Sequence, residues 1–366
     1  MKVTIVGAGP AGLSTAILIK QKLDADIVVL ETGSEGEAPG LGIALLPFGL
    51  AELQQLGIPG FEDFAAQCVA IGRETQAFAG TDEDGVAIAR QSRTQSTQYW
   101  GAKRATLLDF LRRGAASSGV AIRYDCEVSE DRVRSEASIA DLLVGADGAG
   151  SIVRQAFAQQ LSPIAEAATS RFAWLELAGH LEKFIFGYVL VPGEGLVRIT
   201  AYPHGPHVGS AIITHSERMS GFFSQPDMLD EDGEMSAKAV SLLNNLFGPG
   251  LGGIPIVGKT RWRSFRATHC SRAAFGNVAV VGDAFVTVFY ETGWGTSTAL
   301  QEARILRQTL VVKSSVSEAV ELYNRKALEI CNDLITACLR TMREVDAQGS
   351  KMEQVGATQF LASFPA

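Results

Sequence analysis

A glycine-rich turn near the start of the chain constrains the fold more than any other feature. The apolar segment VTIV is followed by Gly7, Gly9 and Gly12, which form a GxGxxG pattern. A helical pattern and a second apolar segment, IVVL, then lead to Glu31. A strand, glycine turn, helix, strand and terminal acid within about thirty residues are typical of a dinucleotide-binding βαβ unit. The sequence therefore predicts a parallel sheet that holds a dinucleotide at its glycine turn.

The residue types in this unit suit the phosphates and sugar of a dinucleotide. The glycines permit a tight turn, a close approach of the pyrophosphate and close packing of the helix on the strand. Pro10 and Ala11 fall in the first turn of the helix, whose free amide groups attract a phosphate. The Glu31 carboxylate is an acceptor for ribose hydroxyls. The alternative is a plain glycine turn with Glu31 solvated at the end of its strand.

Composition and charge indicate a small-molecule partner. Lys and Arg total 32 against 40 Asp and Glu, a net charge of -8, which offers no basic surface for nucleic acid or an anionic membrane. No apolar run approaches the length of a membrane span, and the first residues resemble a strand rather than a signal peptide. The five cysteines lack CxxC spacing, so neither a disulfide framework nor a metal site is expected. We expect a cytoplasmic protein.

The pattern of apolar residues changes along the 366-residue chain and predicts an α/β fold with two interleaved domains. Period-two runs between about 165 and 255 predict an inserted antiparallel sheet that binds substrate. Helical periodicity dominates the C-terminal part. We expect a Rossmann-like domain at 1–75, 98–165 and 258–312, a substrate-binding sheet domain at 76–97 and 166–257, and a C-terminal helical segment at 313–366.

Two further strands end on a carboxylate and a glycine. Asp147 follows the apolar run 142–144, and Asp283 follows the strand-like segment 277–281. Gly293 and Gly295 then begin another helix, whose N-terminus carries partial positive charge. Such a terminus would stabilise a flavin ring that becomes anionic on reduction, and Asp283 could hold the ribitol hydroxyls.

Bulky aromatic residues surround this second glycine turn. Phe289, Tyr290 and Trp294 could wall a dry pocket beside the flavin, or they could simply fill the protein core. On the inserted sheet, Tyr202 could likewise face the flavin or pack inside. His204 and His207 share HxxH spacing, but no acid or cysteine lies nearby, so pocket or loop histidines are favoured over a metal site.

A cation precedes a helix that buries leucines. Arg104 lies at helical spacing from Leu107 and Leu111, which places it at the helix start. A cation there opposes the helix dipole and requires a compensating anion. A phosphate of the bound dinucleotide would serve, and the alternative is a surface arginine.

These motifs, in this order, resemble the single-component FAD-dependent aromatic hydroxylases, the family of para-hydroxybenzoate hydroxylase, over nearly the whole chain. The segments RITAYPHGPHVGSAIITHSE, RWRSF and FYETGWGTSTA look most like the branch that contains the violacein-pathway indole hydroxylase and the aryl-CoA hydroxylases.

The resemblance implies FAD as cofactor, NADH or NADPH as a transient reductant, and O2. Reduced flavin would form a C4a-hydroperoxide that hydroxylates or epoxidises an aromatic or indole-like molecule in secondary metabolism. The resemblance implies no catalytic side chain that we can name. It implies cofactor contacts from Gly7, Gly9, Pro10, Ala11, Gly12, Glu31, Arg104, Val128, Asp283, Gly293, Gly295 and Thr296, and substrate contacts from Tyr202, His204, Tyr290 and Trp294.

The chain also departs from the family pattern. The family usually has a histidine and a proline shortly after Gly-Asp-Ala, and this chain has Val286 and Tyr290 there. An arginine often found near the ring is replaced by the apolar segment GLGIALL. Electrons from a partner flavin reductase therefore stay an alternative. Two other functions also stay open: different redox chemistry on the same FAD fold, and a catalytically degenerate flavin-binding protein.

Overall fold

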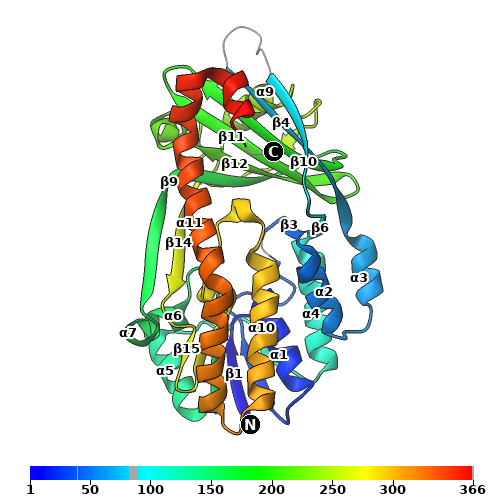
Figure 1. Cartoon of the computed structure of the whole chain (residues 1–366), viewed down its shortest axis with the longest axis vertical. Helices are drawn as coiled ribbons and strands as arrows, with labels where there is room; N and C mark the ends of the chain where they lie inside the picture. The colour runs from blue at the N-terminus through cyan, green and yellow to red at the C-terminus, as the bar shows by residue number, and fades with distance from the viewer. Residues whose placement is uncertain (39, 82–88, 365–366) are drawn as a thin grey trace.

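A computed structural model describes residues 1–38, 40–81 and 89–364. The molecule is elongated, with a parallel sheet in its lower part and a larger sheet in its upper part (Figure 1). The N-terminus lies at the lower end, and the last helix runs along one side to the upper end (Figure 1). The predicted fold class, a Rossmann-like part with an inserted sheet and C-terminal helices, is confirmed.

The lower sheet has the strand order β15-β16-β8-β1-β2-β7. Its strands are apolar because helices cover the sheet; β1 has four buried residues of five, and β8 is buried throughout. All neighbours run parallel except β15 and β16. The bounds are β1 Lys2–Val6, β2 Asp26–Leu30, β7 Ala121–Arg123, β8 Leu142–Gly145, β15 Ala274–Phe275 and β16 Val278–Val280.

Helices pack around this sheet and bring its glycine turn beside a later segment. Helix α1 packs on both α10 and α4, so residues from the two ends of the chain share one core. The helices of this part are α1 Pro10–Lys20, α2 Pro47–Gln55, α3 Phe61–Gln67, α4 Arg104–Ser117, α5 Glu130–Ile139, α6 Ile152–Ala156, α7 Ala158–Leu161 and α10 Gly295–Val312.

The upper sheet follows the order β13-β9-β12-β11-β10-β4-β6-β3, with β14 paired to β9 and β5 to β4. Its long strands are antiparallel as predicted, although β4 and β10 run parallel. The bounds are β3 Gly42–Leu45, β4 Val69–Thr81, β5 Ala89–Thr94, β6 Tyr99–Lys103, β9 Pro163–Leu177, β10 Lys183–Val191, β11 Gly195–Gly205, β12 Val208–His215, β13 Ile256–Val257 and β14 Arg263–Cys270.

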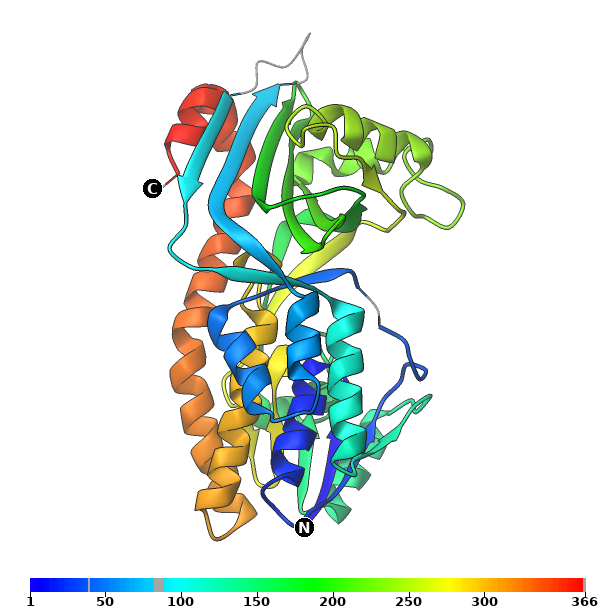
Figure 2. The same ribbon diagram turned by 90° about the vertical axis from the view of Figure 1, so that its right-hand side faces the viewer.

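Alternation along these strands gives the upper sheet two different faces. Val197, Ile199 and Ala201 of β11 belong to a core that packs against helix α9, Ala237–Phe247. Thr200 and Tyr202 point to the other face and line a cavity. Figure 2 shows α9 on one side of this sheet and the last helix on the opposite side. The short elements are α8 Ser220–Phe223, η1 Glu217–Met219, η2 Gly282–Ala284 and η3 Tyr290–Thr292.

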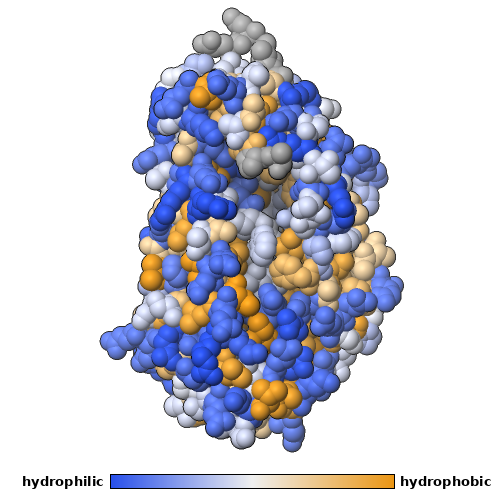
Figure 3. Space-filling view, in the orientation of Figure 1, coloured by the Kyte–Doolittle hydropathy of each residue, from blue (hydrophilic) through white to orange (hydrophobic). Residues whose placement is uncertain are grey.

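Helix α11, Val316–Ala362, joins the two parts of the molecule. It packs on α10 and β15 below and on β4, β5 and β9 above. On the face in Figure 3, hydrophilic side chains predominate over the upper part, and most hydrophobic patches lie over the lower part. Within the described residues, no helix is both long enough and apolar enough to cross a membrane.

Candidate active site

A cavity of about 350 Å³ lies between the ends of the lower strands and the open face of the upper sheet. Gly9, Ala146 and Gly282 come from turns that follow β1, β8 and β16, three neighbouring strands. The carboxyl edge of a parallel sheet is where nucleotides bind in such folds. The other walls are supplied by Pro10, Ala11, Ile43, Ala44, Gln95, Tyr99, Arg104, Gly148, Trp174, Phe184, Phe186, Thr200, Tyr202, Ile212, Asp283, Val288, Phe289, Tyr290, Glu291, Thr292, Gly293, Gly295, Thr296 and Ala299.

The three glycines of the first turn have different roles. A Cβ on Gly7, whose φ is +102°, would lie 2.4 Å from the carbonyl oxygen of Ala146, and one on Gly12 would lie 2.0 Å from that of Gly7. These two glycines permit close packing of backbone on backbone. A Cβ on Gly9 would have no described atom within 4 Å. Gly9 therefore leaves open space on the cavity wall, at the start of α1.

Glu31 ties the end of β2 to the glycine turn. Its carboxylate accepts hydrogen bonds from the backbone N–H groups of Ala8, at 2.6 Å, and Gly33, at 2.8 Å. The Glu31 side chain is half-buried and does not line the cavity among the described residues. It holds the turn in shape and keeps an acceptor near the first glycines.

Arg104 and Asp283 bring opposite charges to the cavity wall. The Arg104 Nε is buried, and no described residue accepts a hydrogen bond from it. Withdrawal from water lowers the pKa of Arg104, and the charge of Asp283 opposes that shift. Asp283 is exposed within the cavity, and partial desolvation by the surrounding walls raises its pKa to about 6, against the opposing effect of Arg104 and Arg154. Arg104 and Asp283 thus line the same cavity.

The start of α10 presents free amide groups to the same cavity. Gly293 has φ +66°, a left-handed conformation that glycine adopts without strain. Gly295 is the first residue of the helix, and no described side chain caps this end. Gly293, Gly295 and Thr296 all line the cavity. Because uncapped N–H groups carry partial positive charge, this wall is suited to a developing anion.

Arg154 fixes the two strand-end turns to one another. It is buried, and its Nη1 donates to the carbonyl oxygens of Asp283, at 3.0 Å, and Ala284, at 3.1 Å. Its Nη2 donates to the carbonyl oxygen of Ala149. No sequence motif marked Arg154 as part of the site, and its only signal is its place shortly after the Asp147-Gly148 turn. Asp147 itself accepts from Ser151 Oγ at 2.6 Å and so orders the start of α6.

Aromatic side chains form the upper wall. The hydroxyl of Tyr202 donates to the carbonyl oxygen of Gly42 at 3.0 Å, and that of Tyr290 pairs with Thr214 Oγ1 at 3.1 Å. The ring of Tyr290 packs on Phe172, with centroids 4.5 Å apart. Burial raises the pKa of both tyrosines, so both stay protonated at neutral pH.

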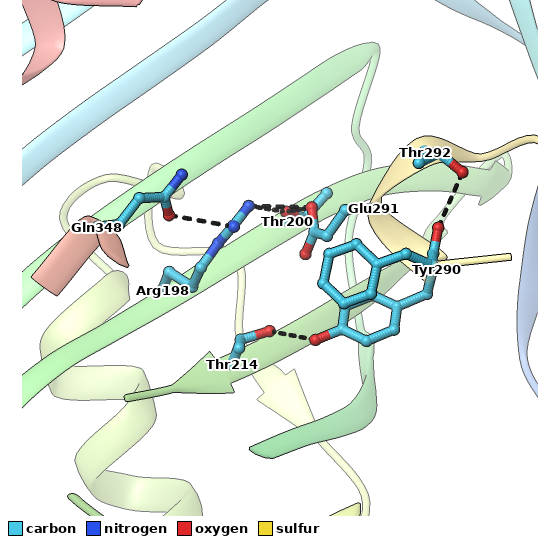
Figure 4. A network of polar contacts seen from close by, with 8 residues as sticks. Arg198, Thr200, Thr214, Tyr290, Glu291, Thr292 and Gln348 are labelled. Carbon is cyan, nitrogen blue, oxygen red and sulfur yellow. Dashed lines mark hydrogen bonds and ion pairs between the residues drawn. The ribbon is translucent and has the colours of Figure 1, made fainter. Parts of the chain in front are cut away.

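A buried ion pair lies beside Tyr290 (Figure 4). Glu291 accepts hydrogen bonds from Arg198 Nη2 at 2.9 Å and from Thr200 Oγ1 at 2.8 Å. Gln348, on α11, accepts from Arg198 Nη1 at 3.1 Å. Glu291 and Arg198 were not predicted from the sequence, because the two partners are far apart in the chain and belong to no motif. A charged residue within an otherwise apolar glycine turn was the only available signal.

Besides Gly7, Gly12 and Glu31, three further expected site residues do not line the cavity in the described structure. Val128 is buried in the lower core. His204 is buried, its Nδ1 lies 3.0 Å from Ser210 Oγ, and burial lowers its pKa to about 4, with a smaller effect from the charge of Lys103. Trp294 is 43% exposed and packs against Phe48. The structure thus brings Tyr202 and Tyr290 to the cavity but not His204 or Trp294.

Comparison with known proteins identifies the family. A model of the FAD binding domain matches residues 1–337. The chain belongs to this FAD-binding family. It is 30% identical to a salicyloyl-CoA 5-hydroxylase of Streptomyces sp over 332 residues, 89% of this chain and 62% of that protein. It is 24% identical to the protodeoxyviolaceinate monooxygenase of Chromobacterium violaceum, over 90% of this chain and 85% of the relative.

Solved structures share the fold of this chain. A 2-methyl-3-hydroxypyridine-5-carboxylic acid oxygenase superposes with a TM-score of 0.71 at 21% identity, over 94% of this chain and 92% of that one. The predicted resemblance to FAD-dependent aromatic hydroxylases, and to the branch with aryl-CoA and violacein-pathway members, is confirmed by these relatives. The predicted cofactor, FAD, is confirmed by the family match.

The cavity residues fit an FAD molecule. Open space at Gly9 beside an uncapped helix start suits a pyrophosphate. The unpartnered Arg104 Nε suits a phosphate or polar oxygen, and the Asp283 carboxylate suits hydroxyl groups. The uncapped start of α10 suits the electron-rich edge of a flavin ring.

Proposed function

We propose that this protein is an FAD-dependent monooxygenase that hydroxylates or epoxidises an aromatic or indole-like small molecule in secondary metabolism. The observation that carries the proposal is the continuity of one cavity, which extends from the glycine turn and the start of α10 to an aromatic wall on the upper sheet. When bound, the flavin would supply the redox chemistry: it takes electrons from NAD(P)H and passes one oxygen atom of O2 to the substrate.

For the cofactor, we propose the contacts expected from the sequence that line the cavity. Gly9 and the start of α1 would hold the pyrophosphate, and Arg104 would neutralise its charge. Asp283 would accept hydrogen bonds from hydroxyl groups. Gly293, Gly295 and Thr296 would direct the partial positive charge of the α10 terminus toward the flavin ring.

For the substrate, we propose that the upper wall binds an aromatic ring and excludes water. Apolar surface comes from Phe184, Phe186 and Ile212. The hydroxyl groups of Tyr202 and Tyr290 are already hydrogen-bonded to Gly42 and Thr214, respectively. Aromatic rings favour such surfaces through burial and edge contacts. A wall that excludes water also protects reactive oxygenated groups in the site from hydrolysis.

A second candidate keeps FAD but lacks hydroxylation. It is favoured by Val286, which stands where the family usually has a histidine and is buried in a bridge with His269. This candidate includes other redox chemistry and binding without turnover. Electrons from a separate flavin reductase are a related variant of the main proposal.

Turnover measurements separate these functions. We expect purified protein to be yellow and to consume NAD(P)H in an oxygen-dependent way when phenols, indoles or aryl thioesters are added. Mass spectrometry should find a product heavier by one oxygen atom, labelled when 18O2 is supplied. Activity that requires an added flavin reductase would support the two-component variant. Bound FAD with no oxygenated product from any substrate would support the second candidate.

The pH dependence of FAD binding tests the proposed role of Asp283. Because the pKa of this carboxyl is about 6 in the protein, it is ionised above pH 6 and loses its negative charge below it. We expect the FAD dissociation constant to rise as pH falls from 7 to 5, by up to about 10-fold per pH unit. Asp283→Asn should bind FAD more weakly at pH 8 and show a flatter profile. Fluorescence titrations of FAD, with circular dichroism to check folding at pH 5, would measure this; identical slopes in both proteins would contradict the role.

A further inference from the structure

A row of side chains crosses the cavity face of the upper sheet. Phe186, Thr200, Ile212 and Trp174 pair in register on β10, β11, β12 and β9. All four line the cavity. Neighbouring strands lie about 4.8 Å apart, so Thr200 and Trp174, two strands apart, are separated by roughly 10 Å. The row forms a largely apolar floor, and Thr200 and Trp174 each add one polar group to it.

Glu291 lies over one of these positions with half of its acceptor capacity unused. Its Oε2 accepts from Arg198 and Thr200, as Figure 4 shows, but its buried Oε1 has no hydrogen-bond partner in the described part of the chain. The Glu291 side chain is 4% exposed, and the residue lines the cavity. Buried polar atoms normally have a partner, so this oxygen needs one that the protein does not supply.

Arg198 keeps a positive charge beside this carboxylate. Burial alone would lower the pKa of Arg198, but the charge of Glu291 raises it, with smaller contributions from Tyr188 and Tyr290, and the net pKa lies above the ordinary value. The guanidinium also lies over the ring of Tyr188, 5.5 Å from its centroid. A purely structural ion pair is most stable when both carboxylate oxygens are satisfied. The free Oε1 therefore indicates a ligand contact in addition to a structural role.

Trp174 supplies a second unpartnered polar atom, a hydrogen-bond donor, at the other position. Its indole Nε1 is buried and has no acceptor among the residues that the structure describes. An indole N–H can only donate, whereas Glu291 Oε1 in an ionised carboxylate can only accept. The floor between them, at Ile212, is apolar. A ring with one substituent toward each residue would span this distance.

We infer that Glu291 accepts a hydrogen bond from a ring N–H or O–H group of the substrate, and that Trp174 donates one to an acceptor at the substrate's far end. The inference rests on the proposed function and specifies its substrate class: a phenol, arylamine or indole that also carries a carbonyl or similar acceptor. A carboxylate at the donor position would repel Glu291. A hydrogen bond to the carboxylate also leaves more electron density on the ring, which suits attack by an electrophilic oxygen.

Matched ligands test the contact with Glu291 in the FAD-loaded wild-type protein. 4-Hydroxyacetophenone carries both a donor and an acceptor, and 4-methoxyacetophenone lacks the donor. Titrations that follow the flavin absorption spectrum should give a dissociation constant roughly 10-fold or more lower for the hydroxy compound, the range for a hydrogen bond to a charged group. Equal dissociation constants for the two compounds would overturn the inference and would leave the proposed function unaffected. No spectral response to any aromatic ligand would count against both.

Variants separate a substrate contact from a structural role. In Glu291→Gln, the preference for 4-hydroxyacetophenone over its methyl ether should fall below about 3-fold, because a neutral acceptor forms a weaker hydrogen bond. Gln348→Ala is the matched control: it removes another partner of Arg198 but does not change the described cavity wall, so the preference should persist. A preference that falls equally in both variants would contradict the substrate contact.

A third ligand, compared with 4-hydroxyacetophenone, tests the contact with Trp174. 4-Ethylphenol keeps the donor of 4-hydroxyacetophenone but lacks its acceptor. The wild-type protein should prefer the ketone, and Trp174→Phe should remove most of that preference while the donor preference remains. A ketone preference unchanged by Trp174→Phe would overturn this part. If Glu291→Gln does not fold, the wild-type ligand pair still decides the Glu291 contact.

Discussion

Gly9→Val is expected to give a folded protein that retains less FAD than the wild type. The backbone at Gly9 has φ -75° and ψ -179°, which valine adopts without strain. A Cβ there would meet no described atom within 4 Å, so the substitution fills the open space on the cavity wall rather than a protein contact. If the pyrophosphate occupies that space, overfilling it should weaken FAD binding by about 10-fold to 100-fold, equivalent to 1–3 kcal/mol.

Two other glycines, Gly12 and Gly150, provide the controls for this experiment. Gly12→Val should destabilise the protein itself, because its Cβ would lie 2.0 Å from the carbonyl oxygen of Gly7. Gly150→Val also adds a Cβ into space with no described atom within 4 Å, but at a residue that does not line the cavity, so folding and FAD retention should both persist. Thermal unfolding and the ratio of flavin to protein after gel filtration measure the two effects. Normal FAD retention in Gly9→Val would contradict the proposed place of the pyrophosphate.

Local patterns predicted much of the lower part of the site, although they missed Arg154 and misplaced Val128. The GxGxxG turn predicted the β1–α1 junction because Gly7 and Gly12 are required by backbone contacts a few residues away or across a neighbouring strand, while Gly9 leaves open space. Asp283 and the start of α10 were predicted because a strand end followed by glycines leaves a carboxylate and free amide groups at a sheet edge. These features depend on local backbone geometry, which the sequence encodes directly.

The upper part of the site depends on long-range pairing, which one sequence does not reveal. Arg198 and Glu291 meet because β11 lies above η3, and 93 residues separate them. Alternation predicted that half of the strand residues face a cavity, but not which half. Trp294 was expected in the pocket because it lies among other aromatics, yet the short turn between η3 and α10 directs it outward, 43% exposed. A turn has no period from which a facing direction can be predicted.

Glu302 is a buried carboxyl group that should make stability depend strongly on pH. The residue is 1% exposed, and its carboxyl oxygens accept from the backbone N–H of Gly282 at 2.5 Å and from Cys331 Sγ at 3.3 Å. Burial raises the pKa of Glu302 to about 8; hydrogen bonds from Gly282 and Cys331 oppose this shift, and the charge of Asp283 adds to it. At neutral pH the side chain is therefore mostly protonated, directly below the turn that carries Asp283.

We expect Glu302→Gln to become more stable relative to the wild type as pH rises from 5 to 9. A glutamate in an unfolded chain has a pKa of about 4.3, so between that pH and about 8 the folded wild type holds a proton that the unfolded chain has lost. Wild-type stability must then fall as pH rises through this window, by on the order of 5 kcal/mol in total. Glutamine keeps an acceptor for Gly282 and has no proton to lose, so the stability of Glu302→Gln does not fall in this way as pH rises.

Urea unfolding of the FAD-loaded proteins at pH 5, 7 and 9 would measure the difference. Glu166→Gln is the control, because Glu166 is a partly exposed carboxylate whose pKa is lowered by a hydrogen bond from Arg343. Its stabilising effect is lost only as pH falls below the ordinary glutamate range, so the stability difference between Glu166→Gln and the wild type should be flat from pH 5 to 9. A Glu302→Gln difference that is equally flat would mean that Glu302 is ionised in the folded protein, and that the Gly282–Asp283 turn tolerates a second negative charge beneath it.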